Sequence, residues 1–129
     1  MMSLRPFQKV LLSLAALGIL VTLIVTLWRS TVILGSVLMM LTLLLFLVSG
    51  NRARDAVPFC TGALLGPLME AIVIRSGAWQ YAQPTFAGIP LWLPFLWGLT
   101  AVFLMKISRW CLPAVSSEPT SPSPGPASR

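Results

Sequence analysis

Glu70 is the residue of this sequence best placed to do chemistry, because it is the one acid inside a long apolar run. If that run crosses a membrane, a charged side chain near its centre costs about 2.5–3.5 kcal/mol unless it is paired, hydrated or protonated. Aromatic residues that can hold lipophilic or cationic guests follow it: Trp79, Tyr81, Trp92 and Trp97. We therefore expect a ligand-binding cleft with Glu70 at its base and these aromatic residues around it.

Small residues at helical spacing indicate how such a cleft could form. Gly62, Gly66 and Glu70 recur at every fourth position, which places them along one stripe of a helix. The two glycines form a small-residue pattern that lets a second helix approach closely. Pro94 and Gly98 have the same spacing further along the chain. We predict that Gly62, Gly66, Pro94 and Gly98 pack two helices together.

Each of these residues also has a purely structural interpretation. Tryptophans at the ends of spans commonly anchor a helix at the membrane interface. Glycine pairs at this spacing also occur by chance in membrane helices. Glu70 could serve only as a hydrogen-bond partner, for which the sequence offers Ser76, Gln80 and Tyr81. A functional role is favoured for Glu70 because ionisable residues within membranes are expensive to keep.

The composition indicates the environment of these residues. Of 129 residues, 57% are hydrophobic and 9% are charged, and the mean hydropathy is +0.88, whereas about 25% of residues are charged in soluble domains. The net charge of +6 comes from Lys and Arg scattered at the edges of apolar runs, so we expect no nucleic-acid partner. The chain has no His, and Cys60 and Cys111 form no Cys-x-x-Cys pair, so we expect neither a metal nor a cofactor.

Four apolar runs predict an all-α, polytopic integral membrane protein with four transmembrane helices. The runs cover about residues 10–28, 31–49, 57–74 and 89–105, and they make residues 1–111 one membrane domain. Residues 50–56 are predicted to form a loop. Residues 112–129 are rich in Pro and Ser and lack an apolar period, so they are predicted to form a disordered tail.

The basic residues predict an orientation. With four spans and a cytoplasmic amino terminus, only Arg29 and Arg75 lie outside, and seven basic residues lie inside: Arg5, Lys9, Arg52, Arg54, Lys106, Arg109 and Arg129. This asymmetry follows the positive-inside rule, so both termini are expected inside and the Glu70 cleft outside. A prokaryotic inner membrane is the expected location.

A block from Glu70 to Gly98 resembles part of a known family. Gly77, Trp79 and Tyr81 follow Glu70 at fixed spacing, and the pattern G-I-P-x-W-x-P-x-x-W-G covers residues 88–98. The block is similar to one in carotenoid hydratases and related small polytopic membrane proteins. The resemblance implies action on the C=C bonds of isoprenoid chains, with Glu70 protonating or positioning the substrate. It also implies that Tyr81 and the tryptophans line a groove for a polyene.

Three functions are compatible with these residues. The favoured hypothesis is a non-catalytic subunit, or a protein that binds a lipid or another lipophile, with membrane lipids and either a second copy or a larger membrane complex as partners. The alternatives are a membrane enzyme acting on an isoprenoid lipid and a small proton-coupled transporter. The sequence therefore leaves open whether the protein is an enzyme. A lone carboxyl group cannot easily both donate and abstract a proton, so the enzyme hypothesis requires an oligomer or a partner.

Overall fold

The computed structural model describes residues 5–112, and that part of the chain is helical without a β-sheet. Its four helices are α1 (Pro6–Leu27), α2 (Thr31–Val48), α3 (Arg52–Arg75) and α4 (Leu93–Cys111). Three segments are long and apolar enough to cross a membrane: Phe7–Leu27, Thr31–Val48 and Arg52–Arg75. The all-α class is confirmed, and these three helices indicate a membrane protein. The predicted disordered tail lies outside the described residues from position 113 onward.

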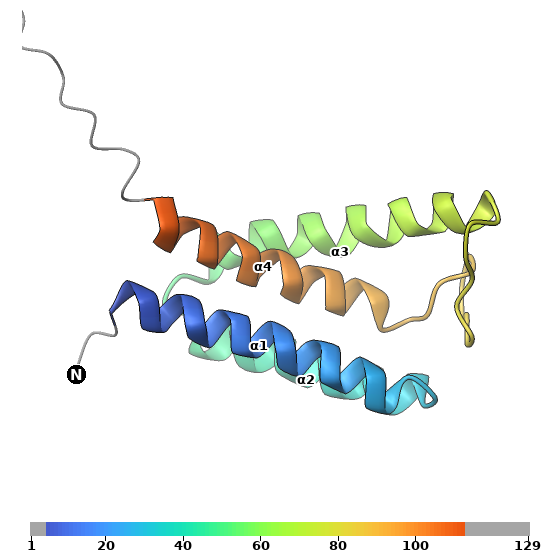
Figure 1. The fold of residues 1–129 in the computed structure, drawn as a ribbon, viewed down its shortest axis with the longest axis horizontal. Helices are drawn as coiled ribbons and strands as arrows, with labels where there is room; N and C mark the ends of the chain where they lie inside the picture. Colours follow the sequence, from blue (N-terminus) through green and yellow to red (C-terminus); the bar gives the residue numbers. More distant parts are fainter. Residues whose placement is uncertain (1–4, 113–129) are drawn as a thin grey trace, which may run out of the picture.

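The four helices run up and down beside one another (Figure 1). The start of α1 and the end of α4 lie at the same end of the molecule, together with the turn between α2 and α3. The α1–α2 turn and the longer segment 76–92 lie at the opposite end. The closest pairing is between α3 and α4, and the next closest is between α1 and α4.

Two predicted helix starts differ from the structure. The segment 50–56 was expected to be a loop, but α3 already begins at Arg52. Asn51 makes this early start possible, because its side-chain oxygen accepts a hydrogen bond of 3.0 Å from the backbone N–H of Arg54 and so caps the helix. The first helix also begins earlier than position 10, at Pro6, a residue whose missing N–H does no harm in a first helical turn.

The fourth helix is shifted toward the carboxyl end relative to the predicted span of 89–105. A tight turn closes at Ile89, whose N–H donates to the Phe86 carbonyl at 2.9 Å. Ala87 and Gly88 between them have positive φ angles of 51° and 84°, which a helix cannot contain. As a result α4 begins at Leu93 and continues to Cys111, and its last turns include Lys106 and Arg109.

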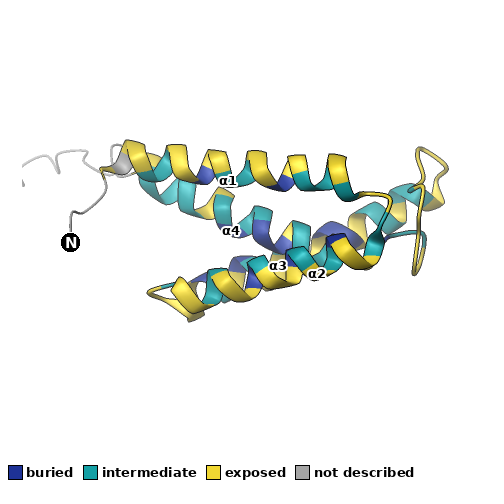
Figure 2. Ribbon diagram, turned by 90° about the horizontal axis from the view of Figure 1, so that it is seen from below, coloured by how far each residue is buried: buried dark blue, intermediate teal, exposed yellow. Residues whose placement is uncertain are grey.

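The buried core lies between α1, α2 and α4. It contains Leu20, Leu34, Leu38, Trp92, Leu93 and Leu99. Figure 2 shows that exposed residues lie along much of each helix, and many of them are large and hydrophobic, as expected for faces that meet lipid. The buried residues of α3 are Asp55, Pro58, Gly66 and Pro67. Because α3 pairs mainly with α4 and reaches this core only through Phe59, the α3–α4 interface forms a separate site.

Candidate functional site

Glu70 lies on α3, half-buried, and both of its carboxyl oxygens are hydrogen-bonded. The indole Nε1 of Trp97 on α4 donates to Oε1 at 2.7 Å, and the Tyr81 hydroxyl donates to Oε2. An indole N–H can only donate, so Oε1 must act as an acceptor there. The Tyr81 hydroxyl donates in the same way, so both carboxyl oxygens of Glu70 act as acceptors. These two hydrogen bonds fix the position of the Glu70 carboxyl group between α4 and Tyr81.

The segment 76–92 brings Tyr81 to Glu70. Gly77, with a φ of 80°, ends α3 and reverses the chain. The Thr31 hydroxyl at the start of α2 donates to the Gln83 side-chain oxygen at 3.4 Å, which ties the segment to the helix bundle. The Tyr81 ring then packs edge-on against Trp92, with ring centroids 6.0 Å apart. Trp92 is therefore part of the support for Tyr81.

The two glycines of α3 allow α4 to approach closely. A Cβ at Gly62 would lie 2.6 Å from the Trp97 carbonyl oxygen and 2.6 Å from Ala101 Cβ, and a Cβ at Gly66 would overlap the Trp97 indole. On the other side of the contact, a Cβ at Gly98 would lie 2.5 Å from the Phe59 ring. These close approaches let the Trp97 indole reach Glu70.

The other predicted packing residue, Pro94, has a different place. It occupies the first turn of α4, where the missing N–H of a proline leaves no helical hydrogen bond unmade. Pro94 therefore leaves α4 uninterrupted and helps to start the helix.

A groove of about 760 Å³ runs along the α3–α4 interface. Trp79, Glu70 and Trp97 lie at one end, Arg54 and Arg109 lie at the other, and the walls between them are apolar: Val57, Leu65, Met69, Ala101, Leu104 and Met105. Of the five predicted ligand-binding residues, Glu70, Trp79 and Trp97 line this groove. Tyr81 does not line the groove itself, but it donates a hydrogen bond to Glu70, which does. Trp92 is only 5% exposed and belongs to the core.

Glu70 has no basic partner among residues 5–112, where the ion pairs involve only Asp55. Its two hydrogen-bond donors are neutral. Burial and the adjacent Glu70 carboxylate raise the pKa of the Tyr81 phenol well above its ordinary value of 10.0. Tyr81 therefore keeps its proton, and remains a donor to Glu70, throughout the physiological pH range.

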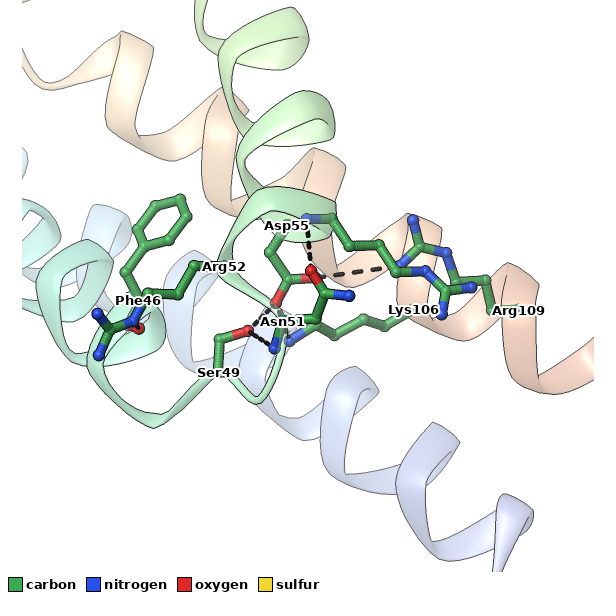
Figure 3. A network of polar contacts seen from close by, with 8 residues as sticks. Phe46, Ser49, Asn51, Arg52, Asp55, Lys106 and Arg109 are labelled. Carbon is green, nitrogen blue, oxygen red and sulfur yellow. Dashed lines mark hydrogen bonds and ion pairs between the residues drawn. The ribbon is translucent and has the colours of Figure 1, made fainter.

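Asp55 forms a second polar cluster that the sequence interpretation missed (Figure 3). Its buried carboxylate lies 2.8 Å from Lys106 Nζ and 4.0 Å from Arg109 Nη1, and it accepts a hydrogen bond of 2.8 Å from the Ser49 hydroxyl. The cluster joins the α2–α3 turn to the end of α4. One sequence signal pointed to it, since an acid four residues after the capping Asn51 lies in a first helical turn, where the helix dipole favours a negative charge.

Comparison with protein families, curated proteins and solved structures finds no match to this chain. The similarity to carotenoid hydratases therefore stays a prediction. Three of the residues that define it, Glu70, Tyr81 and Trp97, nevertheless meet at one hydrogen-bonded site.

The described residues contain no group of three or more His, Cys, Asp or Glu side chains that could hold a metal ion. The chemical groups at the Glu70 end of the groove are a carboxyl group, a phenol and two indoles beside apolar walls, and two guanidinium groups lie at the other end.

Proposed function

We propose that this protein is a multi-pass membrane protein that binds a lipophilic ligand in the α3–α4 groove without transforming it. The observation that carries this proposal is the groove itself, about 760 Å³ of apolar space with the hydrogen-bonded Glu70 at one end. Binding sites for small molecules are typically concave and mostly apolar, with a few fixed polar groups that orient the ligand. Glu70 would orient the polar end of the ligand, and Trp79 and Trp97 would contact its apolar body.

The proposal includes a topology in which all four helices cross the membrane and both termini are cytoplasmic. The Glu70 end of the groove then faces outside, and the end with Arg54 and Arg109 faces the cytoplasm. The arrangement of the helices supports this topology, because the basic ends of α3 and α4 lie beside the start of α1.

Photolabelling tests the groove as a binding site. The full chain, in phosphatidylcholine vesicles, is irradiated with an uncharged long-chain probe that carries a diazirine, and the adducts are mapped by mass spectrometry. We expect Leu65 and Leu104, which line the groove, to be labelled several-fold more than Leu64 and Leu68, which do not line it. The four side chains are all 54–71% exposed, so equal labelling would show lipid contact alone and would contradict the proposal.

A second candidate function is supported by the contact between Tyr81 and Glu70. In an isoprenoid hydratase, the protonated form of Glu70 would give its proton to one carbon of a C=C bond, and water would add to the other carbon. The carboxylate would then take up the proton that the added water releases, relayed through the Tyr81 hydroxyl, so that the acid is restored. Incubation with an acyclic polyene distinguishes the two candidates. A product heavier by one water, absent with Glu70→Gln, would favour the enzyme, whereas binding without a product favours the first proposal.

A further inference from the structure

A second, polar cavity adjoins the basic end of the groove. It has a volume of about 440 Å³ and lies between the α2–α3 turn and the end of α4. Arg54 and Arg109 line both cavities, so the polar cavity and the apolar groove meet at these two side chains. We propose that this junction binds an anionic phospholipid, with its phosphate at Arg54 and Arg109 and one acyl chain in the groove. This inference rests on the proposed function for the groove that holds the chain.

The charges of the polar cavity favour an anion. Three cations, Arg54, Lys106 and Arg109, line it together with one carboxylate, Asp55, so the four side chains carry a net charge of 3 − 1 = +2. Asp55 lies 2.8 Å from the Lys106 ammonium, which it largely neutralises, and its distance to Arg109 is longer, at 4.0 Å. Within the described chain, the Arg54 side chain makes no hydrogen bond or ion pair. Two guanidinium groups therefore keep donors for a phosphate, which arginine binds in a bidentate manner.

The groove beyond these arginines suits an acyl chain. From Arg54 its wall continues along α3 through Val57, Thr61 and Leu65. Leu65 lies eleven positions after Arg54, which corresponds to about 16 Å along the helix axis. This length is close to half the thickness of the hydrocarbon core, which is roughly 30 Å. An anionic lipid of the leaflet at this end would therefore fill the near half of the groove and leave the Glu70 half for the proposed ligand. In phosphatidylcholine vesicles, which hold no anionic lipid, the near half with Leu65 and Leu104 stays open to the uncharged probe.

Another residue places the junction at the level of lipid headgroups. Trp110 lines the polar cavity beside Arg109, and tryptophans concentrate at the interface between the hydrocarbon core and water. Basic pockets between membrane helices on the cytoplasmic side are known to bind anionic headgroups. Among residues 5–112, a second copy would offer only two acids, Asp55 and Glu70, and both are already hydrogen-bonded within their own chain, so we commit to the lipid.

Competition between two lipids tests this inference. The full chain in mild detergent is offered equal amounts of phosphatidylglycerol and phosphatidylcholine with identical acyl chains, and bound lipid is counted by native mass spectrometry. We expect phosphatidylglycerol to be preferred, and we expect Arg54→Gln or Arg109→Gln to reduce that preference by up to about tenfold, the effect of losing one charge-assisted contact. Arg75→Gln is the matched control, because it removes an exposed positive charge from the other end of α3 and should leave the preference unchanged.

Three outcomes would overturn the inference. The first is no preference in the unmodified chain, and the second is an equal loss with Arg75→Gln, which would indicate only general attraction between charges. The third is crosslinking of a photoreactive residue at position 65 to a second copy instead of to lipid. Labelling of the groove by the uncharged probe is measured separately, so a labelled groove without headgroup preference would leave the proposed function standing. Arg54→Gln keeps the test valid if Arg109→Gln unfolds the protein, since the Arg54 side chain has no partner among residues 5–112.

Discussion

The Trp97 indole donates a hydrogen bond of 2.7 Å to Glu70 across the α3–α4 interface. This bond brings together residues 27 positions apart in the chain, and it depends on Gly66, where a Cβ would overlap the same indole. Gly62 and Gly66 therefore do more than let two helices pack, because they also set the position of the Trp97 N–H that donates to Glu70.

Trp97→Phe should destabilise the protein by about 1 kcal/mol, because it removes a donor to a half-buried carboxyl group and keeps most of the aromatic contact. Trp79→Phe is the matched control, since Trp79 lines the same groove at 51% exposure without contacting Glu70 through a hydrogen bond. Thermal unfolding in detergent measures both variants. Equal losses of stability would show that the Trp97–Glu70 hydrogen bond contributes little.

The pKa of Tyr81 can be measured without interference, because it is the only tyrosine of the chain. The pKa of Tyr81 is raised in the folded protein, so the protonated phenol makes its full contribution to the free energy of unfolding below pH 10.0. That contribution decreases as the pH rises above 10.0 toward the folded-state pKa. Titration followed by tyrosinate absorbance should give a midpoint well above 10.0. Glu70→Gln should move the midpoint back toward 10.0, and an unchanged midpoint would mean that Glu70 does not act on the phenol.

Asp55→Ala should destabilise the protein by roughly 2–3 kcal/mol, because it leaves Lys106 without its partner. We expect a value below that for a fully buried ion pair, since the Lys106 side chain is still 23% exposed. Arg109→Gln, which removes the longer contact of 4.0 Å, should destabilise less. Chemical unfolding in detergent compares the two variants, and a larger effect from Arg109→Gln would contradict the assignment of Lys106 as the main partner.

The four-span topology predicts the side of the membrane on which each loop lies. Reporter fusions after Asn51 and at the carboxyl terminus should both read cytoplasmic, and a cysteine placed at Ala82 in a chain lacking Cys60 and Cys111 should react with an impermeant reagent from outside. An external signal from either fusion would contradict the orientation. An external signal from the carboxyl-terminal fusion alone would argue against α4 as a membrane span, and protection of position 82 from outside would argue against α3 as one.

The sequence predicted best what depends on local pattern. The run 31–49 matches α2 (Thr31–Val48) almost residue for residue, because polar residues bound it on both sides. The association of Glu70 with Tyr81 could also be anticipated, since a short returning segment keeps the two residues near each other. The start of α3 could not be placed as well, because a charged segment resembles a loop until its cap at Asn51 is recognised.

What the sequence could not predict depends on distant contacts. Asp55 looked like a loop residue because its main partner, Lys106, comes 51 positions later in the chain. Trp92 looked like part of the cleft, but the turn ending at Ile89 delays the start of α4, and Trp92 packs in the core against Gly35 on α2. In both cases the fold of other segments decided which neighbour the side chain meets.

The most direct test of the proposed function is to block the groove and measure photolabelling by the uncharged diazirine probe. Leu65→Trp places a larger side chain in the groove, and Leu64→Trp makes the same change at an adjacent exposed position that does not line it. We predict that Leu65→Trp lowers labelling of Leu104 to the level of Leu68, which does not line the groove, and that Leu64→Trp leaves it unchanged. Unchanged labelling of Leu104 with Leu65→Trp, or an equal decrease with both variants, would contradict ligand binding in the α3–α4 groove.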